Sequence, residues 1–312
     1  MTTPASRPDV HSPPARARRL GLYGPFIALA IALGAWSLVW VALAWGIESR
    51  LDGLAIREVA HGTTLAWSRR QVSGYPFRLD LEFDNLVWRN AAGSGLKLPE
   101  LKTETTLLAF GHWVAFAPAG ATILRGPKGP VTVSAQVLRA SISALGAHPP
   151  SLSVEGAAMT FKPSAGAAPY WLTAADGLHL HSRAGPNDHG ALFVELDKAM
   201  VDPSTPIGRL AGEAPLELTV DALFDHASAL QGPTPASALA NWRAAGGLAH
   251  PRAVSVQLGG LTLSADGGAV GIDSDGRLNG RLTHAGLPLL SFAGGRTRAA
   301  GAVDMAPAPK LY

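Results

Sequence analysis

Cysteine is absent from the 312 residues of this chain, which excludes disulfides, thiolate metal sites, iron–sulfur clusters and cysteine nucleophiles. Charge is scarce as well, because 16% of the residues are charged, against roughly 25% in a usual soluble domain. Hydrophobic residues make up 47% of the chain, a composition that excludes disorder throughout. The sequence therefore predicts folded structure with a large apolar surface to bury.

A basic surface is also lacking in most of the chain. The formal net charge is +3, but residues 1–19 alone hold four arginines and one aspartate, which leaves 22 basic and 22 acidic residues in the rest. A neutral body lacks the basic face that neutralises phosphates. We therefore expect no nucleic-acid partner.

Recognisable catalytic and cofactor motifs are missing too: the chain has no phosphate loop, dinucleotide fingerprint or G-x-S-x-G elbow. His179 and His181 share one face of a strand, and such a pair can bind Zn²⁺. The nearby Asp176, Asp188 and His189 supply no third ligand at a recognisable spacing, so a solvent-facing strand is the favoured interpretation. The sequence predicts no catalytic residue, no metal site and no cofactor.

Residues 273–276 begin like a calcium loop. Leu278 and His284 stand at its sixth and twelfth positions, where Gly and Glu belong, so we predict an ordinary turn. Asp176-Gly177 and Asp275-Gly276 are interpreted as two Asp-Gly hairpin turns rather than as a repeat.

The N-terminal segment is the clearest feature that is present. Residues 1–19 carry four prolines and predict a disordered tail. Residues 20–47 contain no charged residue, and about 20 apolar residues are enough to span a membrane as a helix. The arginines before this run place the tail in the cytoplasm. The alternative is a cleaved signal peptide at 42–44 (Ala-Leu-Ala), but its apolar region is typically only about 7–15 residues long. We predict an uncleaved signal anchor over 20–47.

Beyond a stalk or short helix at 48–60, the pattern changes to a period of two. Leu79, Leu81 and Phe83 alternate with charged residues, and further apolar alternations lie between 131 and 263, separated by Gly- and Pro-rich turns at 92–95, 125–130, 184–188 and 273–276. Helical spacing favours one helix near 235–245 and a second near 221–230. The predicted fold is mainly β: a curved antiparallel sheet over 61–312, open as a groove or closed as a sandwich, with one or two accessory helices.

The early strand motif carries a resemblance. Gly74-Tyr75-Pro76-Phe77-Arg78, followed by the aromatic stretch 109–114, resembles a family of alphaproteobacterial membrane-anchored periplasmic proteins of unknown function. The layout is also similar to AsmA-like envelope proteins, which implies an inner-membrane anchor, a periplasmic β-groove and a role in lipid traffic.

The same motif supplies the candidate site residues. Gly74 permits a sharp turn, Pro76 suits a strand start, and Phe77 is expected to begin the apolar face of the strand. Tyr75, Phe77 and Arg78 are either a plain hairpin entry or the mouth of a groove, with Arg78 meeting an anionic headgroup. Trp113 and Phe116 either pack in the core or lie against the bilayer.

The expected function is binding rather than catalysis. We expect a single-pass inner-membrane protein, with its N-terminus in the cytoplasm and its β domain in the periplasm, that binds or shields a phospholipid in envelope homeostasis. The alternatives are a scaffold that contacts other envelope proteins and, third, a metal-dependent hydrolase.

Overall fold

A computed structural model describes residues 20–60, 62–232, 235–293, 296–299 and 306–307. Internal contacts divide the chain into two units, Met1–Ile47 and Glu48–Tyr312, and each is considered by itself. The predicted tail at 1–19 lies outside the described residues.

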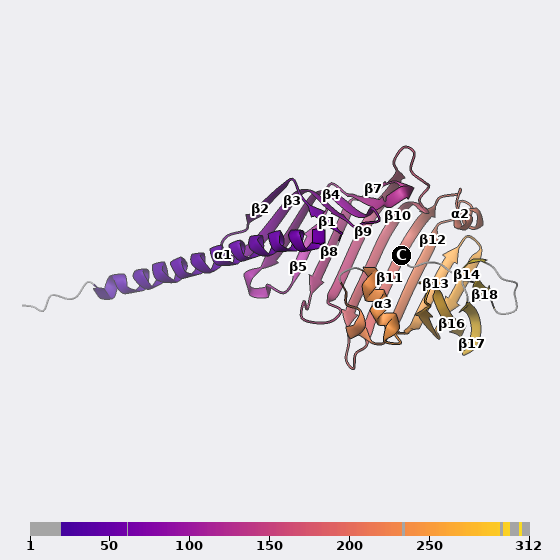
Figure 1. Cartoon of the computed structure of the whole chain (residues 1–312). Coiled ribbons are helices and arrows are strands. Elements are labelled where there is room, and N and C mark those ends of the chain that lie inside the picture. The colour runs from indigo at the N-terminus through magenta and orange to yellow at the C-terminus, as the bar shows by residue number, and fades with distance from the viewer. Residues whose placement is uncertain (1–19, 61, 233–234, 294–295, 300–305, 308–312) are drawn as a thin grey trace, which may run out of the picture. The chain divides into compact units, whose positions relative to one another are not determined.

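Helix α1 spans Leu20–Ala60, so the predicted anchor and the predicted stalk form one continuous helix (Figure 1). Its stretch Tyr23–Arg57 is long and apolar enough to cross a membrane, with a mean hydropathy of 2.3 in its most apolar window. Within the second unit, the Asp52 carboxylate near the end of this helix pairs with the Arg70 guanidinium at 2.8 Å.

The second unit is a β-sheet with short accessory helices. Its strands among the described residues are β1 (Thr64–Ala66), β2 (Arg69–Ser73), β3 (Arg78–Arg89), β4 (Ser94–Thr106), β5 (Trp113–Phe116), β6 (Ala121–Arg125), β7 (Val131–Ser134), β8 (Val137–Ser143), β9 (Ser151–Pro163), β10 (Leu172–Ala184), β11 (Gly190–Val201), β12 (Leu216–Phe224), β13 (Ala249–Leu258), β14 (Leu261–Ala265), β15 (Gly267–Ile272), β16 (Leu278–His284), β17 (Leu287–Ala293), β18 (Arg296–Ala299) and β19 (Ala306–Pro307). The helices are α2 (Pro206–Ala211), α3 (Pro235–Ala244) and the 3₁₀ turns η1 (Leu107–Ala109), η2 (Gly126–Lys128) and η3 (Ala227–Ala229).

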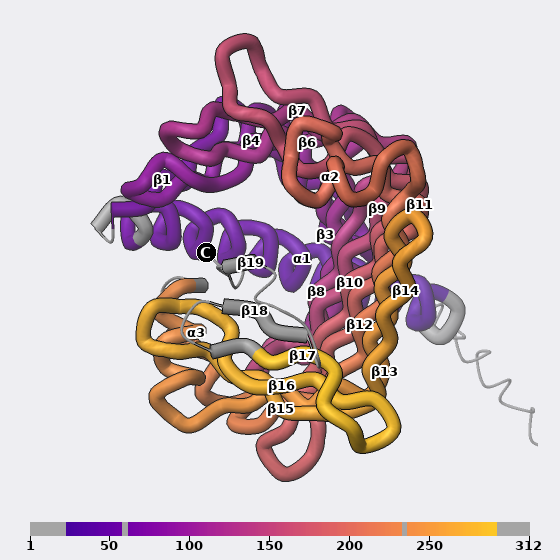
Figure 2. The backbone as a smooth tube through the Cα atoms, turned by 90° about the vertical axis from the view of Figure 1, so that its right-hand side faces the viewer, coloured from indigo at the N-terminus to yellow at the C-terminus, as the bar shows by residue number. Residues whose placement is uncertain are grey.

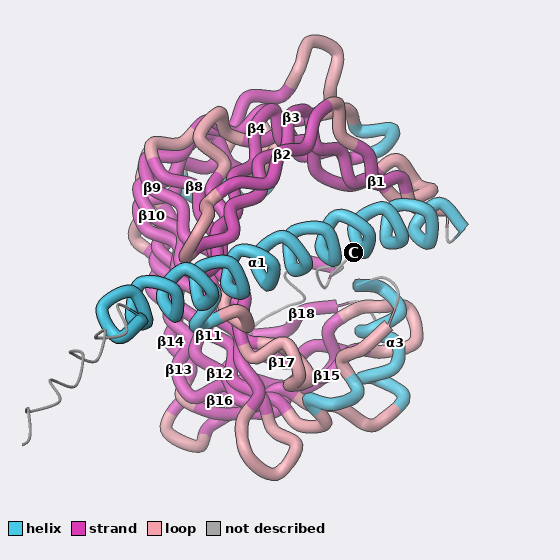
Figure 3. Tube along the Cα trace, turned by 90° about the vertical axis from the view of Figure 1, so that its left-hand side faces the viewer, coloured by secondary structure: helices cyan, strands magenta, loops and turns pink. Residues whose placement is uncertain are grey.

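All strand pairs are antiparallel and belong to one connected sheet, which confirms the predicted fold class. Strands β9 to β14 follow one another as neighbours, and β15 to β19 continue beyond β13. Figures 2 and 3 view the sheet from its two ends and show it curving, with β1–β4 and β15–β17 at opposite sides of the arc of β8–β13.

The alternation of apolar and charged residues along β3 explains which face of this strand is buried. Leu79 is fully buried and Leu81 and Phe83 are 5% exposed, while the charged residues between them face the other way. The prediction that Phe77 begins this apolar face is wrong, because Phe77 precedes the strand and is 71% exposed. The buried face begins two residues later, at Leu79.

The two helix predictions have opposite outcomes. Helix α3 confirms the one near 235–245. The helix near 221–230 is wrong: β12 runs through Phe224 and only the short turn η3 follows. Phe224 pairs with Gly190 on β11 and with Ala249 on β13, so ladder pairing on both sides holds this segment extended.

All four predicted Gly- and Pro-rich turns join consecutive strands, the one at 125–130 through η2 between β6 and β7, but one Asp-Gly interpretation fails. Asp275-Gly276 is a turn between β15 and β16, whereas Asp176-Gly177 lies inside β10. Gly177 pairs with Ala157 on one side and Asp197 on the other, so it is an interior strand residue.

Candidate functional site

The sheet forks between β4 and β9. The first half of β4 pairs with β6, its second half pairs with β5, and these two strands reach β9 through β7 and β8. On β9, the split coincides with a bulge, since Ala158 has φ 49° and separates the part paired to β8 from the part paired to β7. Two arms of the sheet therefore diverge around one spot.

An apolar cavity of about 320 Å³ lies at this fork. Strands β4 to β10 all contribute to its wall: Leu96, Leu98, Leu101, Ala115, Phe116, Ala117, Ala121, Ile123, Val133, Leu138, Arg139, Ala140, Val154, Met159, Phe161 and Leu178. Arg139 is the charged residue among them, and its Nε donates to Glu155 Oε2 at 2.7 Å. Because that charge is already paired, the cavity suits an apolar ligand.

The apolar wall continues along the sheet. Residues directly opposite one another in antiparallel strands share a face, and the register aligns one row of half-buried side chains: Ala140, Val154, Leu180, Val194, Val220 and Val254. A second row holds Leu138, Leu178, Leu196, Leu218 and Val256. Because most of these side chains stay partly accessible, this face is incompletely covered, which favours the groove over the closed sandwich.

The motif residues lie elsewhere, at the end of the sheet where β2 turns into β3. Gly74 has φ 96°, and a Cβ there would lie 2.9 Å from the Arg78 backbone, so this turn requires glycine. Tyr75 and Phe77 are 55% and 71% exposed. Leu108, in η1, is 96% exposed, and the Leu107 amide donates to the Phe77 carbonyl at 3.1 Å, so the two loops adjoin. Together Tyr75, Phe77 and Leu108 form what we term the apolar tip.

Arg78 follows the apolar tip and contacts two carboxylates. Its guanidinium lies 3.5 Å from Asp80 Oδ2 and 3.4 Å from Glu104 Oε2. An anionic headgroup at Arg78 would therefore compete with Asp80 and Glu104 for the same guanidinium.

The two aromatic candidates on β5 lie in different environments. Phe116 lines the cavity at the fork, whereas Trp113 is half-buried and packs edge-on against Phe110 with ring centroids 5.9 Å apart. Of the residues proposed from the sequence, the cavity thus contains Phe116, and the turn before β3 holds Gly74, Tyr75, Pro76 and Phe77.

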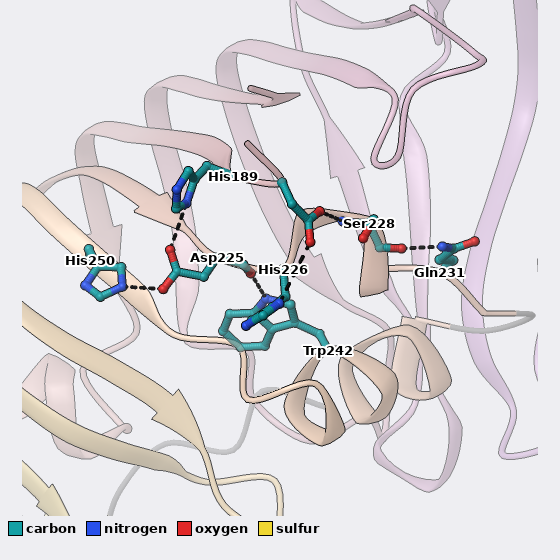
Figure 4. Close-up of polar contacts among 8 residues, drawn as sticks. His189, Asp225, His226, Ser228, Gln231, Trp242 and His250 are labelled. Atoms are coloured by element: carbon teal, nitrogen blue, oxygen red, sulfur yellow. Dashed lines mark hydrogen bonds and ion pairs between the residues drawn. The ribbon is translucent and has the colours of Figure 1, made fainter. Parts of the chain in front are cut away.

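A cluster of polar side chains, which we term the Asp225 cluster (His189, Asp225 and His250), joins the ends of three neighbouring strands (Figure 4). Asp225 follows β12 and lies between two imidazoles, with Oδ1 2.8 Å from His189 Nδ1 and Oδ2 2.7 Å from His250 Nε2. Trp242 on α3 donates its Nε1–H to the Asp225 carbonyl at 2.6 Å. The hydrogen bond from His250, aided by His189, holds the pKa of Asp225 below its usual range despite partial burial.

Asp188, beside this cluster, stabilises the η3 turn. Its Oδ1 accepts the Ser228 amide at 2.7 Å, and this hydrogen bond lowers the pKa of Asp188. Asp188 therefore contacts the η3 turn and His189 contacts Asp225, and among the described residues neither joins His179 in a cluster of potential metal ligands.

A serine–histidine pair also occurs on the polar face, where Ser153 Oγ lies 2.9 Å from His181 Nδ1. It borders a depression of about 490 Å³ that also includes Asp221. Asp221 pairs with Arg252 at 3.4 Å, so the carboxylate that would orient an imidazole in a triad is committed elsewhere.

Sequence reasoning missed the fork and the Asp225 cluster. The alternating run at Val131 and Val133 did signal an inward face, but no local pattern tells that β7 pairs with β6 and β9. Asp225 lies 36 and 25 residues from its two histidines, so no spacing rule connects them.

Comparison with known proteins gives one match. A family described as "Uncharacterized protein conserved in bacteria" (DUF2125) matches residues 40–286. Neither the curated proteins nor the solved structures yield a match.

Proposed function

The chain belongs to DUF2125, an uncharacterized family conserved in bacteria. From this premise and the apolar cavity at the fork of the sheet, we propose that it is a single-pass inner-membrane protein that binds or shields a lipid chain in the periplasm. The observation that carries the proposal is the cavity of about 320 Å³ and its apolar wall. Each 100 Å² of apolar surface withdrawn from water contributes about 2.5 kcal/mol, so an acyl chain along this face would be held firmly.

The helix supports the membrane part of the proposal. The stretch Tyr23–Arg57 meets the length and composition of a membrane span. Arg16, Arg18 and Arg19 lie shortly before it in the sequence, which favours a cytoplasmic N-terminus and a β domain on the periplasmic side.

The apolar tip supports a lipid partner at the sheet's end. Exposed Tyr75, Phe77 and Leu108 are costly in water and favourable at a bilayer interface, where aromatic side chains concentrate. Asp52, near the end of α1, pairs with Arg70 on β2, the strand that leads directly into this turn. In the proposal, the apolar tip contacts the bilayer and the groove accepts the lipid chain.

Photo-crosslinking in living cells tests the lipid. Leu138 and Val137 are adjacent on β8, but Leu138 lines the apolar cavity and Val137 lines a depression on the polar face. A photoreactive amino acid at Leu138 is expected to yield a phospholipid adduct by mass spectrometry, and the same group at Val137 is expected to yield none. Absence of lipid at Leu138, or equal labelling at both positions, would contradict the proposal.

A scaffold role is the competing function, in which the sheet contacts other envelope proteins without a ligand. The same experiment distinguishes it, because a scaffold yields protein adducts at the surface and no lipid adduct at Leu138. A binding role of either kind requires no catalytic residue or cofactor.

A further inference from the structure

A second site lies on the opposite, polar face of the sheet. His179 on β10 stands directly across from Glu195 on β11, and Gly177 stands across from Asp197. The ligand atoms of His179, Glu195 and Asp197 all lie within 4.8 Å of one another. We propose that this trio binds a divalent transition-metal ion, with Zn²⁺ as the ion that fits one imidazole and two carboxylates.

Asp197 is two residues from Glu195 on β11, so the two side chains share a face of the sheet, and a backbone irregularity lies beside Asp197. The β11–β12 register shifts between Leu196 and Ala199, and Lys198 has φ 42°, so a bulge redirects the residues between them. A Cβ on Gly177 would lie 2.6 Å from Asp197 Oδ2. Glycine at 177 therefore leaves the space into which the carboxylate leans, next to His179.

The three side chains are available for a ligand. Within the described residues, none of their heads makes a hydrogen bond or ion pair, whereas two acidic residues of the same depression are paired: Glu155 with Arg139, and Asp176 with Lys198 at 3.6 Å. Two carboxylates this close repel one another, and a divalent cation bound between them would remove that repulsion. Donors around tetrahedral Zn²⁺ stand roughly 3.4 Å apart, so small rotamer changes close the site.

The coordination would be incomplete. Three protein donors leave one position of a tetrahedral ion for water or for an anionic group such as a phosphate. This metal site lies across the sheet from the lipid cavity and does not depend on the lipid proposal.

Metal titration of the full chain in detergent tests the site. After removal of metal with a chelator, isothermal titration with zinc sulfate and elemental analysis after gel filtration should give one tightly bound Zn²⁺ per chain. His179→Ala, Glu195→Gln and Asp197→Asn should each weaken that binding about tenfold or more. His181→Ala is the matched control, since His181 lies on the same face with its ring centroid 6.4 Å from His179 and faces Ser153.

The outcomes separate the possibilities. Loss of the bound ion in the three ligand variants, with binding retained in His181→Ala, supports the site. Absence of saturable uptake, uptake that survives His179→Ala, or an equal loss in His181→Ala would overturn it. If His179→Ala fails to fold by circular dichroism, the isosteric Glu195→Gln and Asp197→Asn variants decide. Lipid crosslinking at Leu138 is unaffected by either result.

Discussion

Leu79 and Phe77 are two residues apart at the start of β3, yet their environments are opposite. Leu79 is fully buried, and Phe77 is 71% exposed in the turn. The difference arises because the Gly74 turn precedes Phe77 and the ladder with β4 begins at Arg78. A strict alternation read from the sequence assigns both to one face, so hydrophobicity alone misplaced Phe77.

This contrast predicts unequal losses of stability. Leu79→Ala leaves a cavity in the core and should lower the free energy of unfolding by about 2–5 kcal/mol. Phe77→Ala removes an exposed ring and should change it by less than about 0.5 kcal/mol. Thermal unfolding of the two detergent-solubilised variants, followed by circular dichroism, measures the difference. Equal midpoints would show that β3 is not packed as described.

Asp225 gives a prediction for how the stability of the fold changes at acid pH. Its pKa is lowered in the folded chain, mainly by the His250 hydrogen bond, so its ionised form stabilises the fold above the unfolded value of about 3.9. That contribution is lost as pH falls through the lower, folded pKa. Asp225→Asn should therefore cost about 1 kcal/mol near pH 6 and progressively less below about pH 4.

Denaturant titrations of wild type and Asp225→Asn at several pH values measure this effect. Asp221→Asn is a suitable control, since that carboxylate pairs with exposed Arg252 on the same sheet. A stability difference for Asp225→Asn that stays constant from pH 6 to pH 3 would argue against the histidine-bound carboxylate.

At the scale of elements, the local sequence pattern predicted correctly those helices and turns that contacts between nearby residues determine. Helix α3 and the four strand-joining turns follow from spacing and turn chemistry. Asp176-Gly177 failed as a turn because its neighbours β9 and β11 supply ladder partners that outweigh the local preference. Residues 221–224 failed as a helix for the same reason, since β11 and β13 flank them.

The close approach of Gly190 on β11 to Phe224 on β12 predicts that substitution of this glycine lowers stability. Gly190 stands opposite Phe224, and a Cβ at 190 would lie 2.1 Å from the Phe224 ring. Gly190→Ala should displace that ring from the core beside Trp242 and cost about 1–3 kcal/mol. Gly260→Ala, where no atom lies within 4 Å of the added Cβ, should stay within about 0.5 kcal/mol of wild type. Melting temperatures of the pair measure it, and a neutral Gly190→Ala would refute this packing.

At the scale of the molecule, the sequence predicts a β domain after an apolar helix but not where a ligand would sit. The cavity depends on β4 and β9 each dividing their pairing between two partners, and such pairings join residues far apart in the chain. Of the proposed site residues, Phe116 lies in that cavity because β5 forms one arm of the fork. Tyr75 and Phe77 were identified from the motif at 74–78, and only the fold shows that they adjoin Leu108.

Membrane topology is the property on which the whole proposal depends, and the absence of cysteine makes it directly measurable. Ala165→Cys places a single thiol on an exposed turn between β9 and β10, and Ser12→Cys places one before the helix. In cells with a permeabilised outer membrane, a membrane-impermeant maleimide should label Cys at 165 at once and Cys at 12 only after lysis, because the arginines before the helix favour the cytoplasm. The opposite labelling pattern would place the sheet in the cytoplasm, and its apolar face would then need a different ligand.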